Sequence, residues 1–149
     1  MIRRQTAPRQ MLVVDTPDDL WPALRRLERR SGVLVLAPLD AAERRRLRHI
    51  AGSRALTVVA EQPRSAVRVH DSRELRQALL RRTPLILLSP IHRTSSHPDW
   101  HPLPRMRAAA FARLAGWRLF ALGGMNRRRY AKIAPLGFIG WAGISAFRT

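Results

Sequence analysis

Three segments in the C-terminal half of the chain carry residue types that bind phosphate groups. Residues 89–98 are rich in hydroxyls and include His97, while Gly123 and Gly124 join an expected strand to an expected helix. Residues 137–145 are mostly small and end in a serine. Hydroxyls, backbone N–H groups, which glycine lets approach an anion closely, and a cation are the groups that hold phosphoryl oxygens. We therefore expect these segments to contribute to one phosphate site.

The first two segments also have an ordinary structural interpretation. Residues 89–98 contain many turn formers, and two adjacent glycines suit any tight turn between a strand and a helix. The phosphate interpretation gains weight because all three segments follow expected strands, and the loops after parallel strands form one rim. The last two loops of a β/α barrel are also its usual phosphate site.

Two titratable residues lie at expected strand ends and are candidates for chemistry. His70 follows an apolar strand, where it is either a polar rim residue or a general acid/base. Glu61 follows the preceding expected strand and is an acid near the same rim. The chain contains no G-x-S-x-G, Walker or H-E-x-x-H motif. A zinc site is not expected at His92, His97 and His101, because they lie in a proline-containing loop, with Pro98 between the last two, and match no metal-binding motif.

The elements that must position these residues follow a regular alternation of strands and helices. Short β-branched runs are expected as strands at residues 11–15, 32–37, 55–60, 66–70, 84–89, 118–122 and 138–142. Segments at helical spacing are expected at residues 16–31, 40–52, 71–82, 105–115 and 126–135, the first three of them with a capping residue at the start. This alternation is typical of β/α units around a parallel sheet.

The alternation is broken once, between the third and fourth expected strands. Residues 61–65 are too few for the crossover of a dozen or more residues that parallel neighbours need. Either the two strands form an antiparallel hairpin, or one β/α unit of a barrel is missing around residues 60–66. The chain has 149 residues, fewer than the roughly 200 or more of a complete eightfold barrel. We therefore predict a shortened TIM-type (β/α) barrel, with residues 1–10 as a tail and residues 11–149 as a single domain.

The charge of the chain is strongly positive, with 28 lysines and arginines against 10 acids and a net charge of +18. Nearly all of it comes from arginine, because Lys132 is the single lysine. The arginines occur on every expected helix, which favours a generally basic surface over a dedicated nucleic-acid face. The chain has no cysteine, no signal-peptide core in the sequence given and no long apolar run, so we expect a cytoplasmic protein without a membrane span.

The order and spacing of the C-terminal motifs resemble the thiamine phosphate synthase/TenI family. The resemblance rests on four runs over roughly the last 80 residues, written in one-letter code as VHDSREL, LILLSPIHRTSSHP, FALGGMN and GWAGISA. In that family a strand leads into a loop of the form [GS]-P-x-F-x-T-x-[TS]-[KH]-P. An A-L-G-G-[IM] turn and a closing G-x-x-x-[IV]-S-A strand follow it.

The resemblance implies a substrate class and a set of binding residues. Synthases of this family join hydroxymethylpyrimidine diphosphate to thiazole phosphate and release pyrophosphate with the help of Mg²⁺. The residues that would hold the thiazole phosphate or pyrophosphate are Thr94, Ser96, His97, Gly123, Gly124, Ile144 and Ser145. His70 and Glu61 are the candidate catalytic residues, and no residue is assigned to the metal.

Three functions within this resemblance stay open, because the N-terminal half differs from the family pattern. The synthases place a cationic cluster after the second strand and Asn-Asp after the third, where this chain has residues 36–40 and Ala60-Glu61. The first interpretation is a synthase; the second is a TenI-type thiazole tautomerase, which needs His70 but no diphosphate site. The third is a non-catalytic binder of a phosphorylated ligand, and an arginine-rich nucleic-acid binder stands outside the resemblance.

Overall fold

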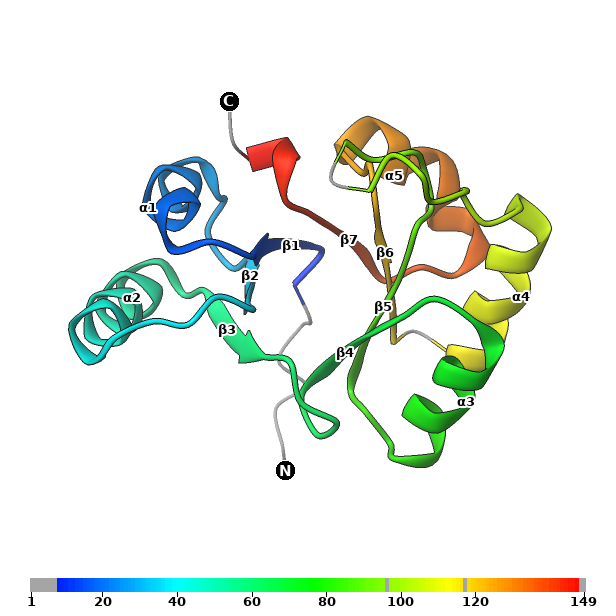
Figure 1. Cartoon of the computed structure of the whole chain (residues 1–149), viewed down its shortest axis with the longest axis horizontal. Coiled ribbons are helices and arrows are strands. Elements are labelled where there is room, and N and C mark those ends of the chain that lie inside the picture. Colours follow the sequence, from blue (N-terminus) through cyan, green and yellow to red (C-terminus); the bar gives the residue numbers. More distant parts are fainter. Residues whose placement is uncertain (1–7, 96, 117, 148–149) are drawn as a thin grey trace.

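The computed structural model describes residues 8–95, 97–116 and 118–147, and its centre is a seven-stranded sheet (Figure 1). The strands are β1 (Gln10–Val14), β2 (Gly32–Val35), β3 (Thr57–Ala60), β4 (Ala66–Val69), β5 (Leu85–Leu88), β6 (Leu119–Leu122) and β7 (Gly140–Gly143). Their order is β3-β2-β1-β7-β6-β5-β4, and every pair of neighbours is parallel. The sheet curves into a nearly closed, barrel-like shape, which confirms the predicted parallel α/β architecture.

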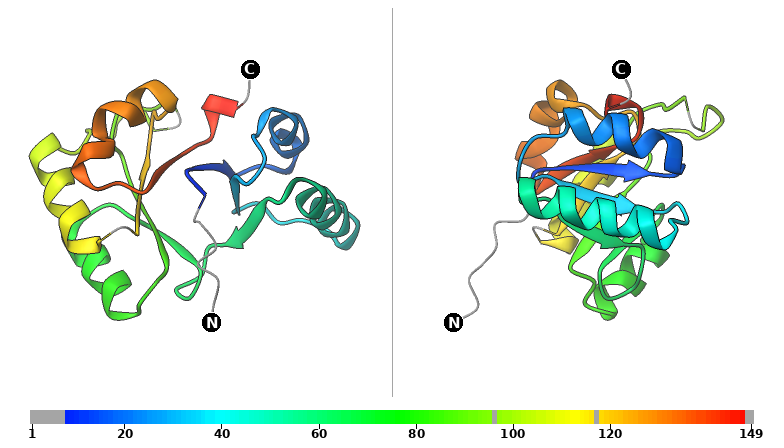
Figure 2. Two further views of the ribbon diagram at one scale, coloured as in Figure 1. Left: turned by 180° about the vertical axis from the view of Figure 1, so that it is seen from behind. Right: turned by 90° about the vertical axis from the view of Figure 1, so that its left-hand side faces the viewer.

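Helices cover the outer face of this sheet, as Figures 1 and 2 show from three sides. They are α1 (Pro17–Arg26), α2 (Ala41–Arg54), α3 (Ser72–Leu80), α4 (Arg105–Ala115) and α5 (Arg127–Ile133), with short 3₁₀ turns at η1 (Ala134–Leu136) and η2 (Ser145–Phe147). Side-chain caps begin α2, α3 and α5, where Asp40, Asp71 and Asn126 each accept the backbone N–H three residues on. No helix in the described part of the chain is both long and apolar enough to cross a membrane.

Alternating strand residues form two separate apolar layers. The layer between sheet and helices contains Leu12 and Val14 of β1 together with helix residues such as Leu24 and Phe111. The buried residues of the other layer come from strands alone and are Met11, Val13, Leu34, Ala66, Leu87, Phe120, Leu122 and Ala142. Because side chains of a strand point alternately to its two faces, this second layer is the interior that the curved sheet encloses.

The short link between β3 and β4 is the place where the sheet stays open. The two strands occupy opposite edges of the strand order, so they form no ladder with each other. Gln62 and Ala66 exchange two backbone hydrogen bonds of 3.0 and 3.1 Å, which close a tight turn. The hairpin alternative is therefore limited to this one antiparallel bridge, and the chain passes between the edges without a crossover helix.

Several element boundaries differ from those expected from the sequence. α2 continues through Gly52, where a side chain would meet open space, and ends at Arg54, after which Ala55 is in the left-handed conformation. The segment expected as one helix at 126–135 is α5 followed by the tighter turn η1. Helix ends depend on hydrogen bonds that sequence patterns place only to within one or two residues.

Candidate functional site

Two adjoining hollows lie where β5, β6 and β7 end, and the three phosphate-type loops line both of them. The first has a volume of about 60 Å³, and its lining includes Thr94, His97, Gly123, Gly124, Ile144 and Ser145. The second has a volume of about 260 Å³ and shares Thr94, Gly124 and Ser145 with the first. The loops predicted to act together are thus neighbours in space, and we call this region the mouth. Ser96 lies outside the described residues.

The loop after β5 is bound directly to the turn after β6. Backbone N–H groups of Ile91 and His92 donate to the carbonyl oxygens of Leu122 and Gly123, at 3.0 and 3.1 Å. These two bonds continue the pairing of β5 with β6 beyond the end of β5, to the last residue of β6 and the residue after it. The mouth is therefore built on an extension of the sheet, and its position follows from the strand register.

The two glycines at the mouth permit a close approach between loops. Gly123 has a φ of +98°, and a side chain there would stand 3.0 Å from the Cα of Pro90. Gly124 has a φ of +58°, and a Cβ there would overlap the carbonyl oxygen of Arg93. Both positions therefore require glycine on two grounds, backbone conformation and space. In the structure the close neighbour is the β5 loop, a role for these glycines that the sequence did not show.

Positive charge surrounds the larger hollow of the mouth. Arg93 and Arg129 both line it, and the guanidinium of Arg129 donates to the carbonyl of Gly124. Asn126, also in the lining, accepts the backbone N–H of Arg129 at 2.9 Å and so caps α5. Burial lowers the pKa of His92, and the nearby charges of Arg129 and Lys132 lower it further.

An aromatic stack contributes to the wall of the smaller hollow. The ring of His97 lies 4.0 Å from that of Trp100 at an interplanar angle of 9°, and both residues line the hollow. His70 meets the same Trp100 edge-on at 5.1 Å. His70 is thus separated from the hollow by one aromatic ring and does not line it.

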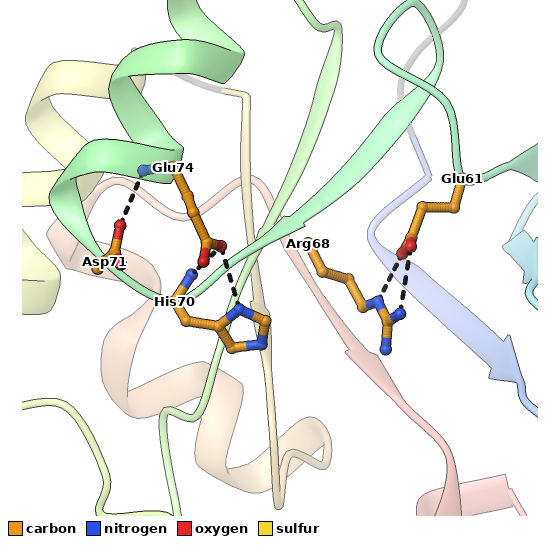
Figure 3. A network of polar contacts seen from close by, with 5 residues as sticks. All are labelled: Glu61, Arg68, His70, Asp71 and Glu74. Atoms are coloured by element: carbon orange, nitrogen blue, oxygen red, sulfur yellow. Dashed lines mark hydrogen bonds and ion pairs between the residues drawn. The ribbon is translucent and has the colours of Figure 1, made fainter.

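A helix cap orients His70, as Figure 3 shows. Asp71 accepts the backbone N–H of Glu74 at 2.8 Å, which caps α3. The carboxylate of Glu74 then reaches back to His70, 3.0 Å from its backbone nitrogen and 3.1 Å from Nδ1. A neutral His70 that donates its Nδ1–H to Glu74 keeps Nε2 as a proton acceptor.

Glu61 is held by an arginine of β4, the next strand along the chain. Two nitrogens of Arg68 lie 2.5 and 3.2 Å from the two carboxylate oxygens of Glu61 (Figure 3). This bidentate pair spans the opening between β3 and β4. Arg68 lines the smaller hollow and Glu61 does not. Of this ion pair, only the positively charged Arg68 therefore lines the mouth.

Sequence reasoning missed Arg68 and Trp100. Arg68 gave one usable signal, a charged residue between two valines of an apolar strand, which places it on the same face as Ala66 of the enclosed interior. Trp100 gave none, because it lies in a long irregular loop whose path depends on tertiary contacts.

The geometry of the mouth is that of a β/α protein with an anion-type hollow at the carboxyl edge of its parallel sheet. The hollow combines hydroxyls, close-packed glycines, several arginines and an aromatic wall. A scan against models of protein families and a search of curated proteins found no match to this chain.

Proposed function

We propose that this chain is a thiamine phosphate synthase-like protein of thiamine biosynthesis, built as a shortened TIM-type barrel. It couples thiazole phosphate with hydroxymethylpyrimidine diphosphate to give thiamine phosphate and pyrophosphate. The observation that carries the proposal is the lining of one hollow by Thr94, Gly124 and Ser145, from three loops whose motifs resemble that family. A volume of about 60 Å³ is several times what one water molecule needs, and it suits a single phosphoryl group.

The charges at the mouth support binding of phosphorylated substrates. Arg68 lines one hollow, and Arg93 and Arg129 line the other. Glu61 offsets part of this charge through its ion pair with Arg68. Guanidinium groups bind phosphoryl oxygens in a bidentate manner, which supports a role for Arg68 in compensating the charge of a departing pyrophosphate.

The aromatic wall supports a heterocycle next to the phosphate. Trp100 is 40 % exposed, and its ring is stacked by His97. A planar aromatic surface beside an anion site suits a flat ring that carries a phosphate ester, because offset stacking is favourable between such rings.

The described residues do not fit the Mg²⁺ that synthases of this family use. They contain no group of three or more acids and histidines able to hold a metal. Glu61, the acid proposed for the rim, is paired with Arg68. We therefore assign the compensation of pyrophosphate charge to the arginines and derive no step through a metal.

The coupling proposal is tested by pyrophosphate release from the two substrates, with and without Mg²⁺. We expect Arg68→Gln to slow release by about 100-fold, the order of effect seen when one charge-stabilising donor is lost. Arg64→Gln, an exposed arginine of the β3–β4 link outside the hollow, should leave the rate unchanged. No release at high enzyme concentration, while thiazole phosphate binds, would exclude the coupling activity.

A TenI-type thiazole tautomerase is the second candidate, and the contact of His70 with Glu74 favours it. Glu74 orients the imidazole, and this arrangement suits a group that moves a proton without a diphosphate site. Isomerisation of the thiazole carboxylate phosphate should collapse in His70→Ala and persist in His49→Ala, an exposed histidine of α2. Unchanged turnover in His70→Ala would reject this role for His70.

Binding without turnover in either assay would identify the third function, a non-catalytic phosphate-ligand binder. Calorimetric titration with thiazole phosphate and with the pyrimidine diphosphate separately distinguishes these cases. The tautomerase and the binder need only the first ligand, while the synthase needs both.

A further inference from the structure

A separate hollow lies at the opposite end of the sheet from the mouth. It has a volume of about 420 Å³ and is lined by residues that begin β1 or lead into β2, among them Arg9, Gln10 and Ser31. α5 contributes Arg127 and Tyr130 to its wall. The mouth lies after the strands, whereas this hollow lies before β1 and β2, so a parallel sheet separates the two sites.

Arginine dominates the charge of this hollow. Four arginines and one acid line it, namely Arg9, Arg29, Arg30, Arg127 and Glu28, which gives a net charge of +3 (4 − 1). They come from three segments far apart in the sequence, so the fold gathers the charge. Like charges brought together in a concave site raise the local potential and attract anions.

The floor of the hollow is polar and buried. Gln10 and Ser31 are only 8 % and 2 % exposed, and the amide of Gln10 donates to the hydroxyl of Ser31 at 3.0 Å. Because the Ser31 hydroxyl oxygen accepts this bond, its O–H can donate to another acceptor. The hydroxyl of Tyr130 donates to the carbonyl of Phe138 at 3.1 Å. Burial raises the pKa of Tyr130, and the charge of Arg9 opposes part of this rise. A buried polar floor below several guanidinium groups distinguishes this hollow from the arginines of the exposed helix faces.

Two of the four arginines already have oxygen partners. Arg127 pairs with Glu28, and their side chains are 70 % and 61 % exposed. Arg29 donates to the carbonyl of Ser53 at 3.2 Å. An ion pair this exposed contributes little to stability, so an anion with a higher charge can displace Glu28 from Arg127.

We propose that this hollow binds a small polyanion with two or more phosphoryl groups, at a site distinct from the mouth. The volume lies within the range of small-molecule sites, about 300–1,000 Å³. Guanidinium groups converging from separate segments match the oxygens of linked phosphates better than those of a single carboxylate. A small ligand is favoured over nucleic acid because the charges converge on a concave site, while a duplex presents its phosphates along an extended line.

Titration of the full chain with pyrophosphate by calorimetry tests this site. All measurements use a chain that also carries Ser145→Asp, which places a negative charge in both hollows of the mouth. Pyrophosphate binding that this variant retains belongs to the hollow at the opposite end of the sheet. In that background we expect Arg9→Gln and Arg30→Gln each to weaken binding by about tenfold. Arg113→Gln, an exposed arginine of α4, changes the net charge equally and should weaken it by less than about twofold.

Glu28→Gln should change the affinity for pyrophosphate in the opposite direction. This variant therefore distinguishes a specific site from general electrostatic attraction. Removing the competing carboxylate should tighten pyrophosphate binding several-fold, because Arg127 is then available without displacement. Four results would each overturn the proposal. They are an equal loss in Arg113→Gln, no gain in Glu28→Gln, no saturable binding in Ser145→Asp, and displacement of pyrophosphate by duplex RNA at comparable phosphate concentration.

Discussion

At the residue scale, the neighbours of Gly124 and its backbone conformation both require glycine at this position of the mouth. Its φ of +58° is in the left-handed region, and its missing side chain makes room for the carbonyl of Arg93. Gly52 differs in both respects, because it lies inside α2 and nothing stands within 4 Å of a Cβ placed there. The two glycines form a matched pair in which the same substitution has opposite consequences.

Gly124→Ala should lower the free energy of unfolding by about 1–3 kcal/mol, from left-handed strain and overlap with the β5 loop. Gly52→Ala should raise it by about 0.5–1 kcal/mol, because alanine favours a helix interior. Urea unfolding of both variants measures the difference. Equal effects of the two substitutions would contradict the close approach at Gly124.

His92 should make stability depend on pH near neutrality. Burial and the charges of Arg129 and Lys132 lower its pKa in the folded chain below the ordinary value of 6.5. The unfolded chain therefore binds the proton more readily, so stability is complete above pH 6.5 and falls as the pH drops toward the folded pKa.

The contribution of His92 is measured by urea unfolding at a series of pH values from about 7.5 to 5. His92→Gln should flatten the dependence in this window, while His49→Gln on the exposed face of α2 should retain it. A wild-type slope that persists in His92→Gln would place the responsible group elsewhere.

At the scale of elements, the junction of β4 and α3 links folding to the candidate site. The cap formed by Asp71 positions Glu74, and Glu74 in turn contacts both the backbone and the ring of His70. Asp40 forms the corresponding cap of α2, where its partner Glu43 returns a bond to the Asp40 backbone and contacts no histidine. The cap of α2 thus stabilises that helix alone. The cap of α3 stabilises its helix and also positions the partner of His70.

Asp71→Ala and Asp40→Ala should each lower the free energy of unfolding by about 1 kcal/mol, the usual effect of losing a cap. Only Asp71→Ala should move the NMR resonances of the His70 imidazole, because only that cap positions its carboxylate partner. Unchanged His70 resonances in Asp71→Ala would show that Glu74 holds the ring without help from the cap.

Local sequence signals were sufficient for most elements and failed at particular places. The caps at Asp40 and Asp71 were recognisable because a capping residue acts within its own first turn. The end of α2 was not, because Gly52 faces open space and the helix continues to Arg54. A glycine ends a helix only where the backbone turns left-handed, and here Ala55 does so.

At the scale of the whole molecule, the two edges of the sheet differ in burial from its middle. β3 is mostly exposed and, within the described residues, pairs only with β2, whereas every residue of β6 is buried between two neighbours. The link of residues 61–65 ties β3 to β4 without covering either edge with a helix. The β2–β3 side should accordingly open more readily than the centre.

Amide hydrogen exchange checks this expectation with two matched hydrogen bonds. The N–H of Thr57 donates to Ser31 at 3.0 Å, and that of Ile86 donates to Arg118 at 2.9 Å. Thr57 should exchange at least about tenfold faster, because it opens with an exposed edge strand while Ile86 lies in the core. Equal protection would indicate that the sheet opens as a single unit.

The sequence by itself determined the alternation of parallel strands with capped helices, the missing crossover after residue 60 and the three loops of the mouth. These features follow from propensity, periodicity and capping, which act over a dozen residues or fewer. Only the tertiary structure decided that Glu61 pairs with Arg68, that Trp100 stands between His70 and His97, and that Arg127 meets Glu28, 99 residues away. Such partners are selected by the curvature and closure of the sheet, which depend on all seven strands together, and no local pattern encodes them.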